Sequence, residues 1–381
     1  MARIAVAGAG FSGAVIAHEL ARAGHTIDVF EPRPHVAGNC HTERDSGSGI
    51  LLHRYGPHIF HTDNERVWNY VRRFDEFMPF TNRVKAVVRA QVYSMPVNLH
   101  TINQFFGQCL GPADARAFLA AQAERPAGEP RNFEEQALAG MGRALYEAFF
   151  RGYTQKQWGR APSELPASVL KRLPLRFSYD DNYYASRWQG LPRHGYTRIV
   201  ERMLDARGIR VHLGIPFTRA MCAGYARVFY SGPIDAWFDH PDGRLGYRTL
   251  DFSFERHDGD FQGNAVINYC DSDVPWTRIA EHKHFAPWET HQATIISREH
   301  SRSCEPADTP YYPLRLATEK ALLARYVERA RAEAKVSFVG RLGTYRYLDM
   351  HVTIAEALAW ADRCKAEGPS NLPAFNVDPL S

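Results

Sequence analysis

The glycine-rich segment Gly8-Ala9-Gly10-Phe11-Ser12-Gly13 constrains the fold of this 381-residue chain more than any other feature. A strand-like apolar run ends at Ala7, just before it. A helix-like stretch from Ala14 to Ala23 and a strand-like stretch from Thr26 to Phe30 follow it. This order is the βαβ unit of a Rossmann-type α/β fold, where the glycines let the backbone approach a pyrophosphate at the helix N-terminus. A glycine turn without a ligand is the alternative interpretation.

Residues at the ends of the predicted strands indicate which dinucleotide this unit binds. Glu31 ends the second strand, about 20 residues beyond the turn, where a carboxylate accepts hydrogen bonds from both adenosine ribose hydroxyls and disfavours a 2′-phosphate. Gly38-Asn39 follows this strand. Gly340-Arg341-Leu342-Gly343 precedes a closing helix whose N-terminus can stabilise negative charge on a reduced flavin. We therefore expect FAD, although the last segment could also be a strand-to-helix turn without a ligand.

The apolar spacing changes along the chain and predicts a Rossmann-type domain interrupted by two other domains. Helix-like spacing runs from Leu99 to Phe150, whereas β-branched and aromatic alternation over residues 82–96, 172–190 and 246–298 predicts a twisted antiparallel sheet. The apolar run Arg227–Tyr230 predicts a strand that returns to the first sheet, so the nucleotide domain is discontinuous. The predicted domains are an FAD-binding domain of residues 1–81, 191–245 and 313–381, an inserted helical domain of residues 98–170, and an antiparallel sheet domain of residues 82–97, 171–190 and 246–312.

Composition excludes several classes of function. The net charge is +4 and the arginines are scattered among acids, which argues against nucleic-acid binding but leaves room for a cationic pocket around a phosphorylated ligand. No apolar run approaches the roughly 18 residues of a membrane span, and we see no signal peptide, so we expect a soluble cytoplasmic protein. The six cysteines lack the paired spacing of a zinc or redox site, and we expect no metal.

Several longer motifs, in the same order, resemble those of the prokaryotic UDP-galactopyranose mutase family across essentially the whole chain. They are Tyr55-Gly56-Pro57-His58-Ile59-Phe60-His61-Thr62, Pro96–Phe105, Phe149–Gly159, Arg172–Tyr183, Trp276–Ile279 and Gly340–Tyr347. The resemblance implies an isomerase that interconverts the pyranose and furanose forms of UDP-galactose. It also implies that FAD is active when reduced, that flavin N5 forms a covalent adduct with the sugar anomeric carbon, and that the protein is a homodimer.

By the same resemblance, Arg172 and Arg278 are the paired arginines that hold the substrate diphosphate, with Arg172 on a mobile loop. Arginine suits this role because it stays charged and its planar fork can bind two phosphate oxygens. His58 lies beside the flavin and is a third candidate for the catalytic site. Without the resemblance, each arginine would be interpreted as a solvated charge, and a histidine in a glycine-proline turn as a structural group.

The remaining site residues implied by the resemblance are polar or aromatic. Those expected at the substrate are Asn82, Phe149, Phe150, Tyr153, Thr154, Trp158, Tyr183, Asn268, Tyr312, Arg341 and Tyr347. Those expected at the cofactor are Gly8, Gly10, Phe11, Ser12, Gly13, Glu31, Gly38, Asn39, His58, Arg341, Asp349 and Met350. The aromatic residues would otherwise be assigned to a hydrophobic core or a sheet surface.

Two positions depart from the family pattern. His351 stands where the family commonly has a second aspartate, and Ala37 stands where it has glycine. Two other functions remain open. One is an FAD oxidoreductase of the amine-oxidase type, which has no need for several arginines and tyrosines around a diphosphate. The other is a nucleotide-sugar-binding protein without turnover.

Overall fold

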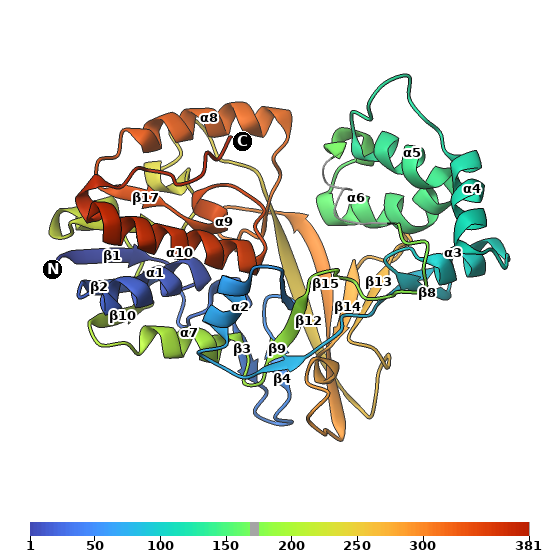
Figure 1. Cartoon of the computed structure of the whole chain (residues 1–381), viewed down its shortest axis with the longest axis horizontal. Helices are drawn as coiled ribbons and strands as arrows, with labels where there is room; N and C mark the ends of the chain where they lie inside the picture. The colour runs from blue at the N-terminus through green and yellow to red at the C-terminus, as the bar shows by residue number, and fades with distance from the viewer. Residues whose placement is uncertain (168–174, 381) are drawn as a thin grey trace.

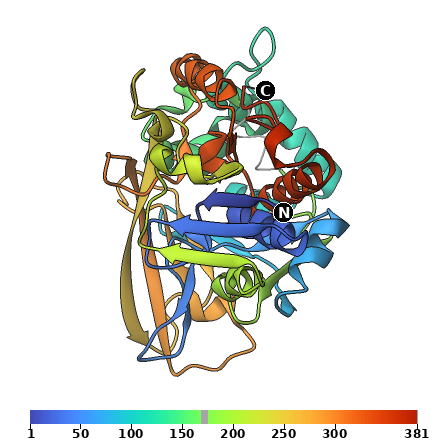
Figure 2. The ribbon, with the colours of Figure 1, turned by 90° about the vertical axis from the view of Figure 1, so that its left-hand side faces the viewer.

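The first layer of the molecule is a parallel sheet, which confirms the predicted Rossmann-type fold. The computed structural model describes residues 1–167 and 175–380. The sheet has the order β10-β2-β1-β11-β17, and all of its strand pairs are parallel. Its strands are β1 (Arg3–Ala7), β2 (Thr26–Glu31), β10 (Ile209–Leu213), β11 (Arg227–Tyr230) and β17 (Val336–Phe338). Figure 2 looks at this layer and shows β1, β2 and β10 one below another.

Helices cover both faces of the parallel sheet (Figure 1). Ile4 and Val6 of β1 belong to the core shared with α1 (Phe11–Arg22), α7 (Tyr196–Leu204) and α10 (Met350–Glu367). Ala5 between them belongs instead to the core shared with α8 (Ala317–Arg331). Alternate residues of the strand therefore face opposite layers, as the period of two of a β-strand requires.

The second layer is a seven-stranded sheet of order β16-β12-β15-β14-β13-β7-β8. Its strands are β7 (Val84–Val88), β8 (Gln91–Met95), β12 (Tyr247–Asp258), β13 (Val266–Tyr269), β14 (Arg278–Glu281), β15 (Ala293–Ser303) and β16 (Tyr312–Pro313). The β12–β15 pair runs in register from Arg248 opposite Ser303 to Asp258 opposite Ala293. Every pair is antiparallel except β13 with β7, so the predicted antiparallel sheet contains one parallel pair.

The third part is helical and lies beyond β8, on the right of Figure 1. Its helices are α3 (Leu99–Phe106), α4 (Pro112–Gln122), α5 (Phe133–Leu145), a π-helical turn η2 (Tyr146–Arg151) and α6 (Gly152–Trp158). Asparagine side chains cap two of them: Asn98 accepts from the Thr101 N–H at 3.1 Å and Asn132 from the Glu135 N–H at 2.9 Å. These helices agree with the helical character predicted for this region.

The predicted strand character of residues 172–190 is wrong for most of its described part. Residues 175–187 contain no strand, and only β9 (Trp188–Pro192) is extended. This strand pairs with β5 (Phe60–Thr62) and β6 (Phe77–Pro79) in a separate three-stranded sheet. The remaining strands and α-helices are β3 (Thr42–Arg44), β4 (Leu51–His53), α2 (Glu65–Val71) and α9 (Gly340–Gly343). Short 3-10 helices are η1 (Gly38–Cys40), η3 (Pro162–Glu164), η5 (Arg219–Gly224), η6 (Ala236–Phe238), η7 (His282–Phe285) and η8 (Pro369–Asn371). In the described part of the chain, no helix combines the length and the apolar character needed to cross a bilayer.

Candidate active site

A cavity of about 430 Å³ lies at the carboxyl ends of β1 and β2, where open α/β sheets bind their ligands. Gly8, Gly10, Phe11, Ser12, Glu31, Gly38, Asn39, His58, Arg341 and Met350 line it, so ten of the residues expected at the cofactor meet there. Glu31 is held by the N–H groups of Ala9 at 2.9 Å and Arg33 at 3.1 Å. Its carboxylate therefore has a fixed orientation at the position predicted for the adenosine ribose.

Two glycines of this turn have no room for a side chain: Gly13 faces backbone, and Gly8 faces the Ser231 side chain and has a φ of 111°. A Cβ on Gly13 would lie 2.0 Å from the Gly8 carbonyl oxygen, and a Cβ on Gly8 would lie 2.0 Å from Ser231 Oγ. Gly10 is the N-cap of α1, and no side chain caps this helix end. Its free N–H groups and dipole fit a pyrophosphate. The cavity thus fits a dinucleotide, with Gly8, Gly10 and Ser12 at the diphosphate.

Ala37, one of the two departures from the family pattern, has a left-handed backbone with φ 73° and ψ 2°. It is 1% exposed, and its N–H donates to the Ala9 carbonyl at 2.9 Å. The left-handed region costs an L-residue with a Cβ roughly 1–2 kcal/mol. Alanine therefore fits the turn sterically, but with backbone strain that a glycine would not have.

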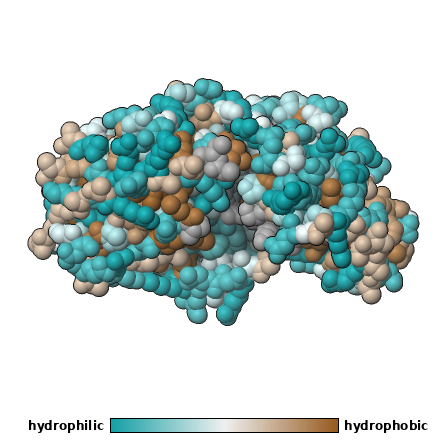
Figure 3. All heavy atoms as spheres, turned by 90° about the horizontal axis from the view of Figure 1, so that it is seen from above, coloured by the Kyte–Doolittle hydropathy of each residue, from teal (hydrophilic) through white to brown (hydrophobic). Residues whose placement is uncertain are grey.

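A second cavity, of about 230 Å³, lies next to the first. Four residues line both cavities: Asn39, His58, Arg341 and Met350. The second cavity is further lined by Tyr183, Arg278, Tyr312, Tyr347 and Asp349, all predicted site residues. Seen from above, the surface is hollowed between the lobe of the parallel sheet and the helical lobe (Figure 3). The four shared residues mark the place where a flavin ring and a substrate would meet.

Arg278 on β14 lies in this second cavity and is held by two partners. Its Nε lies 3.2 Å from Glu299 Oε1 on β15, and its Nη2 donates to the Tyr153 hydroxyl at 3.0 Å. Burial opposes the positive charge, but the Glu299 carboxylate nonetheless raises the pKa of Arg278 well above its ordinary value. A permanently charged, oriented guanidinium is the group that a diphosphate requires.

Glu299 is a functional residue that the sequence analysis missed. It is 2% exposed, and its Oε1 also accepts from the Thr277 hydroxyl at 2.9 Å. Its role depends on the register of β14 and β15, in which Arg278 lies opposite Glu299. A strand of alternating polar and apolar residues carries no signal for this pairing until the register is known.

Arg341 lies between the two cavities and is fixed by backbone carbonyls. Its Nη1 donates to the Tyr311 carbonyl at 3.2 Å, and its Nη2 donates to the Leu348 carbonyl at 2.8 Å. Its guanidinium also lies 4.9 Å from the centre of the Tyr347 ring. This position fits the predicted approach of Arg341 to both the flavin and the substrate.

Tyrosine hydroxyls surround the second cavity. The rings of Tyr312 and Tyr347 stack at 5.4 Å with an interplanar angle of 26°, and Trp158 lies 6.3 Å from Tyr312. Burial raises the pKa of Tyr153, Tyr183 and Tyr312 above the ordinary value. All three hydroxyls therefore stay protonated at neutral pH. Tyr183 and Tyr312 line the cavity and can donate hydrogen bonds to phosphate or sugar oxygens, whereas Tyr153 lies behind Arg278 and lines neither cavity.

His58 is a neutral imidazole at the junction of the cavities. Its Nδ1–H donates to the Gly56 carbonyl at 2.9 Å, which leaves the lone pair on Nε2. Burial, helped by the nearby Arg341 charge, lowers the pKa of His58 to about 4. At neutral pH this side chain can accept a proton or a hydrogen bond at Nε2 but is not a cation.

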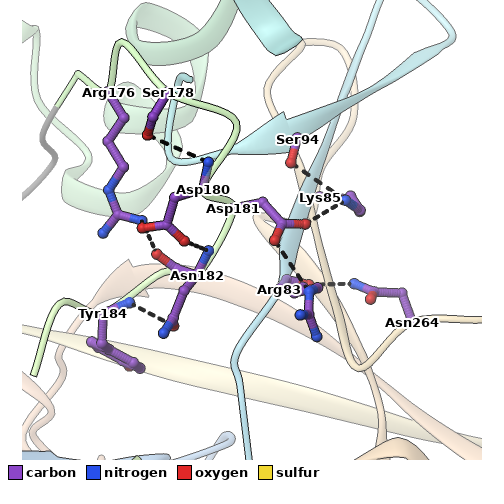
Figure 4. A network of polar contacts seen from close by, with 10 residues as sticks. All are labelled: Arg83, Lys85, Ser94, Arg176, Ser178, Asp180, Asp181, Asn182, Tyr184 and Asn264. Carbon is purple, nitrogen blue, oxygen red and sulfur yellow. Dashed lines mark hydrogen bonds and ion pairs between the residues drawn. The ribbon is translucent and has the colours of Figure 1, made fainter. Parts of the chain in front are cut away.

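The segment before β9 is anchored to the sheet by the charged network of Figure 4. Asp181 Oδ1 lies 3.1 Å from Arg83 Nε, and its Oδ2 lies 3.4 Å from Lys85 Nζ. Just beyond, the Tyr183 N–H donates to the Asn82 carbonyl at 2.8 Å. This anchorage directs Tyr183 into the substrate cavity. Arg172, the partner predicted for Arg278, lies outside the described residues.

The structure does not bring every predicted substrate residue to the cavity wall. Phe149 and Phe150 are 2% and 4% exposed and belong to the large hydrophobic core. Five further predicted residues do not line either cavity: Asn82, Tyr153, Thr154, Trp158 and Asn268. Asn82 and Asn268 each have a buried side-chain carbonyl oxygen without a hydrogen-bond partner in the described chain. These two asparagines stay candidates for contacts with UDP or the sugar.

The parallel sheet and the two neighbouring cavities define an FAD-dependent enzyme. Comparison with known protein families agrees. Residues 6–74 match the family of NAD(P)-binding Rossmann-like domains, and residues 148–347 match the UDP-galactopyranose mutase family. The chain belongs to the UDP-galactopyranose mutase family and is an isomerase. Membership in this family favours the mutase over the oxidoreductase of the amine-oxidase type.

Two relatives are similar over nearly their whole length. A protein of Klebsiella pneumoniae described as a probable UDP-galactopyranose mutase is 54% identical over 376 residues, which is 98% of each chain. A dTDP-fucopyranose mutase of Escherichia coli is 48% identical over 368 residues, which is 95% of this chain and 98% of the relative.

Solved structures share the fold. The crystal structure of a reduced UDP-galactopyranose mutase has a TM-score of 0.73 at 15% identity and covers 97% of this chain and 98% of its own. A redesigned putrescine oxidase has a TM-score of 0.59 at 13% identity and covers 96% of this chain and 99% of its own. At these identities the likeness concerns the fold alone, which a mutase and an amine oxidase share.

Proposed function

We propose that this enzyme interconverts UDP-galactopyranose and UDP-galactofuranose with FAD in its reduced form. The observation that carries the proposal is the position of Arg278: it lines a cavity that shares His58 and Arg341 with the cofactor cavity. A nucleoside diphosphate bound at Arg278 can therefore place its sugar beside these shared residues. An oxidase of a small amine needs no such cation.

Arg278 acts on the leaving group. Cleavage of the bond between the anomeric carbon and the β-phosphate builds negative charge on the phosphate, and a fixed cation at that position stabilises the transition state. Glu299 and the Tyr153 hydroxyl keep the guanidinium in place before the substrate arrives. Arg172 is the predicted second cation.

The remaining residues position the sugar and the cofactor. Tyr183 and Tyr312 offer protonated hydroxyls to the substrate, and His58 Nε2 can accept the proton of the sugar hydroxyl that attacks when the ring closes. Gly8, Gly10, Glu31 and Met350 would hold FAD. When bound and reduced, FAD supplies a nucleophilic nitrogen, N5, for the anomeric carbon.

A second candidate substrate is dTDP-fucopyranose, because the relative of that specificity is 48% identical to this chain. Both compounds are pyrimidine nucleoside diphosphates of a pyranose sugar, so both need the same diphosphate site. Turnover of each sugar nucleotide by one enzyme preparation, compared by kcat/KM, decides between them. A preference of less than about tenfold, which is about 1.4 kcal/mol, would mean that the site accepts both.

The direct test is an assay of ring expansion, from the furanose to the pyranose form, with and without dithionite. We expect the FAD-loaded reduced enzyme to convert UDP-galactofuranose to UDP-galactopyranose, and the oxidised enzyme to be inactive, as followed by chromatography of the sugar nucleotides. Equal rates in both redox states would contradict the reduced-flavin requirement. Binding of UDP without turnover in either state would instead identify a binding protein.

We further propose that the enzyme works as a homodimer in the cytoplasm, as the family resemblance implies. Light scattering on the FAD-loaded protein tests the assembly, with a mass of about twice 43.2 kDa as the expected result. Fractionation of the producing cells tests the location. A monomeric mass or recovery in the membrane fraction would contradict the corresponding proposal.

A further inference from the structure

Two histidines and an aspartate from distant parts of the chain meet at the edge of the substrate cavity. His61 lies on β5, Asp349 is the N-cap of α10, and His351 lies in the first turn of that helix. All three line the second cavity, and one ligand atom from each lies within 4.8 Å of the others. We propose that His61, Asp349 and His351 form a binding site for a divalent first-row transition-metal ion such as Zn²⁺.

The donor set suits such an ion. Imidazole nitrogen and carboxylate oxygen are ordinary ligands of Zn²⁺, and three protein ligands with an open position are typical of zinc sites in contact with small molecules. The sequence analysis predicted no metal because it considered cysteine spacing, and this group becomes visible only once β5 and α10 are adjacent.

His61 already has the support that a metal-binding histidine usually has. Its Nδ1 lies 3.0 Å from Ser186 Oγ, and its ring stacks on Tyr184 at 3.8 Å with an interplanar angle of 14°. A hydrogen bond from Nδ1 to the serine hydroxyl leaves the lone pair on Nε2 and fixes the ring orientation.

His351 supplies an unsatisfied nitrogen. Its Nδ1 is buried and has no hydrogen-bond partner in the described chain. Its ring lies 5.1 Å from that of His61 at an angle of 64°. A buried nitrogen lone pair without a donor is unfavourable, and coordination to a cation would satisfy it.

The geometry needs a small adjustment to bind a metal. Ligand atoms around a tetrahedral Zn²⁺, each about 2.0–2.1 Å from the ion, are about 3.3 Å apart. Rotation of the side chains must therefore bring the three atoms closer by about an ångström or more. Because all three ligands line the cavity, a water molecule in the cavity can complete the coordination.

A second group of three potential ligands, Asp260, Glu281 and His284, shows what an internally satisfied cluster looks like. The Glu281 carboxylate accepts three backbone N–H groups, from Phe261 at 2.8 Å, Gln262 at 2.8 Å and Gly263 at 3.1 Å. The Lys283 ammonium lies 2.8 Å from Asp260 and already supplies a cation. This group is therefore a matched control that should not bind the metal.

The test measures Zn²⁺ binding to the oxidised, FAD-loaded enzyme after removal of metals with a chelator. Titration calorimetry should detect one site per chain. His351→Ala should weaken it at least about tenfold, and His351→Cys should restore it because a thiolate is a zinc ligand. His284→Ala should leave the affinity unchanged. The flavin absorbance and the melting temperature of each variant establish that it is folded. If His351→Ala does not fold, His61→Ala replaces it in the binding test.

Equal Zn²⁺ affinity in wild type, His351→Ala and His61→Ala, or no binding by the wild type, would overturn the proposal. Because the three ligands line the same cavity as Arg278 and Tyr347, bound Zn²⁺ should also raise the KM for the sugar nucleotide and leave kcat unchanged. The effect on KM rests on the proposed function, whereas the calorimetric test of Zn²⁺ binding does not. If the enzyme shows no turnover, the binding test therefore remains valid.

Discussion

Arg278 and Glu299 form an ion pair across neighbouring strands, with 3.2 Å between Nε and Oε1, inside the cavity that receives the substrate. The glutamate cannot contact a diphosphate favourably, because both are negative. Its contribution is to hold the guanidinium that does. Glu299→Gln should therefore raise the activation free energy by about 1.5–3 kcal/mol. This lowers the kcat of the reduced enzyme roughly 10- to 150-fold. An unchanged kcat would mean that Tyr153 alone orients Arg278.

Removal of the cation itself should have a larger effect. Arg278→Ala takes away one charge-assisted contact in the transition state, worth roughly 2.7–4 kcal/mol, and should reduce kcat about 10²- to 10³-fold. Steady-state kinetics with dithionite checks this. Arg329→Ala is the matched control, because Arg329 is an exposed partner of Asp242 at 2.6 Å and lines neither cavity. Near-normal turnover in Arg278→Ala would remove the residue from the site.

The anchorage of residues 175–187 predicts a change in substrate binding. Asp181→Asn removes the ion pairs with Arg83 and Lys85, which are partly exposed and so are worth about 0.2–1 kcal/mol. The looser segment should raise the KM for the sugar nucleotide by up to about fivefold and leave kcat nearly unchanged. Asp180→Asn is the control, since its partner Arg176 has a second acceptor in the Asn182 carbonyl. A loss of kcat without a change in KM would contradict this positioning role.

Buried histidines should make the stability of the enzyme pH-dependent. Burial lowers the pKa of His282 to about 3 and that of His58 to about 4. Both are neutral in the folded state and take up protons on unfolding below an ordinary pKa of about 6.5. The free energy of unfolding should thus fall with decreasing pH between about 6.5 and 4, by about 1.4 kcal/mol per pH unit for each histidine.

Urea unfolding at several pH values checks this dependence. His282→Gln can keep a hydrogen bond to Ser297. This variant should reduce the slope of the free energy of unfolding against pH by about the contribution of one histidine. A slope that is the same in both proteins would mean that His282 is already protonated in the folded state.

The strain at Ala37 predicts a stabilising substitution. Ala37→Gly relieves roughly 1–2 kcal/mol of left-handed backbone strain in the folded state. The opposing effect is the greater entropy of the unfolded chain, which costs about 0.4–1 kcal/mol of stability. We expect a net gain of about 0.5–1 kcal/mol in the free energy of unfolding. Ala90→Gly, in an exposed turn with φ 59°, should give a similar gain and leaves the cofactor cavity untouched. Destabilisation of only Ala37→Gly would show that the Ala37 methyl group packs favourably.

Local patterns predicted much of the fold. The turn from Gly8 to Gly13 and the strands at Ile209–Leu213 and Arg227–Tyr230 were predictable from the sequence. The spacing of apolar residues that distinguishes strands from helices is visible in short consecutive segments. The aromatic residues of 172–190 misled the same reasoning. Tyr183 lines the substrate cavity and Tyr184 stacks on His61, so their apolar character serves the site instead of a sheet.

The site was less accessible to sequence reasoning than the fold. Arg278, Tyr312, Arg341 and Tyr347 could be proposed only through resemblance to a family, and the structure then brings them to one cavity. The neighbouring sequence does not indicate a role for Glu299 or His61. Each contacts a residue, Arg278 and His351 respectively, that becomes adjacent only in the folded chain. Phe149 and Phe150 lie in the core, as their apolar spacing alone indicates.

The order of strands in the parallel sheet has a consequence for synthesis of the enzyme. β1 and β2 come first in the chain, but β17 and the residues Gly340 and Met350 of the cofactor cavity come last. A nascent chain in which these residues have not yet left the ribosome cannot enclose the dinucleotide. Flavin capture is therefore expected only after Gly340 and Met350 have emerged, so a truncation before β17 would yield colourless protein.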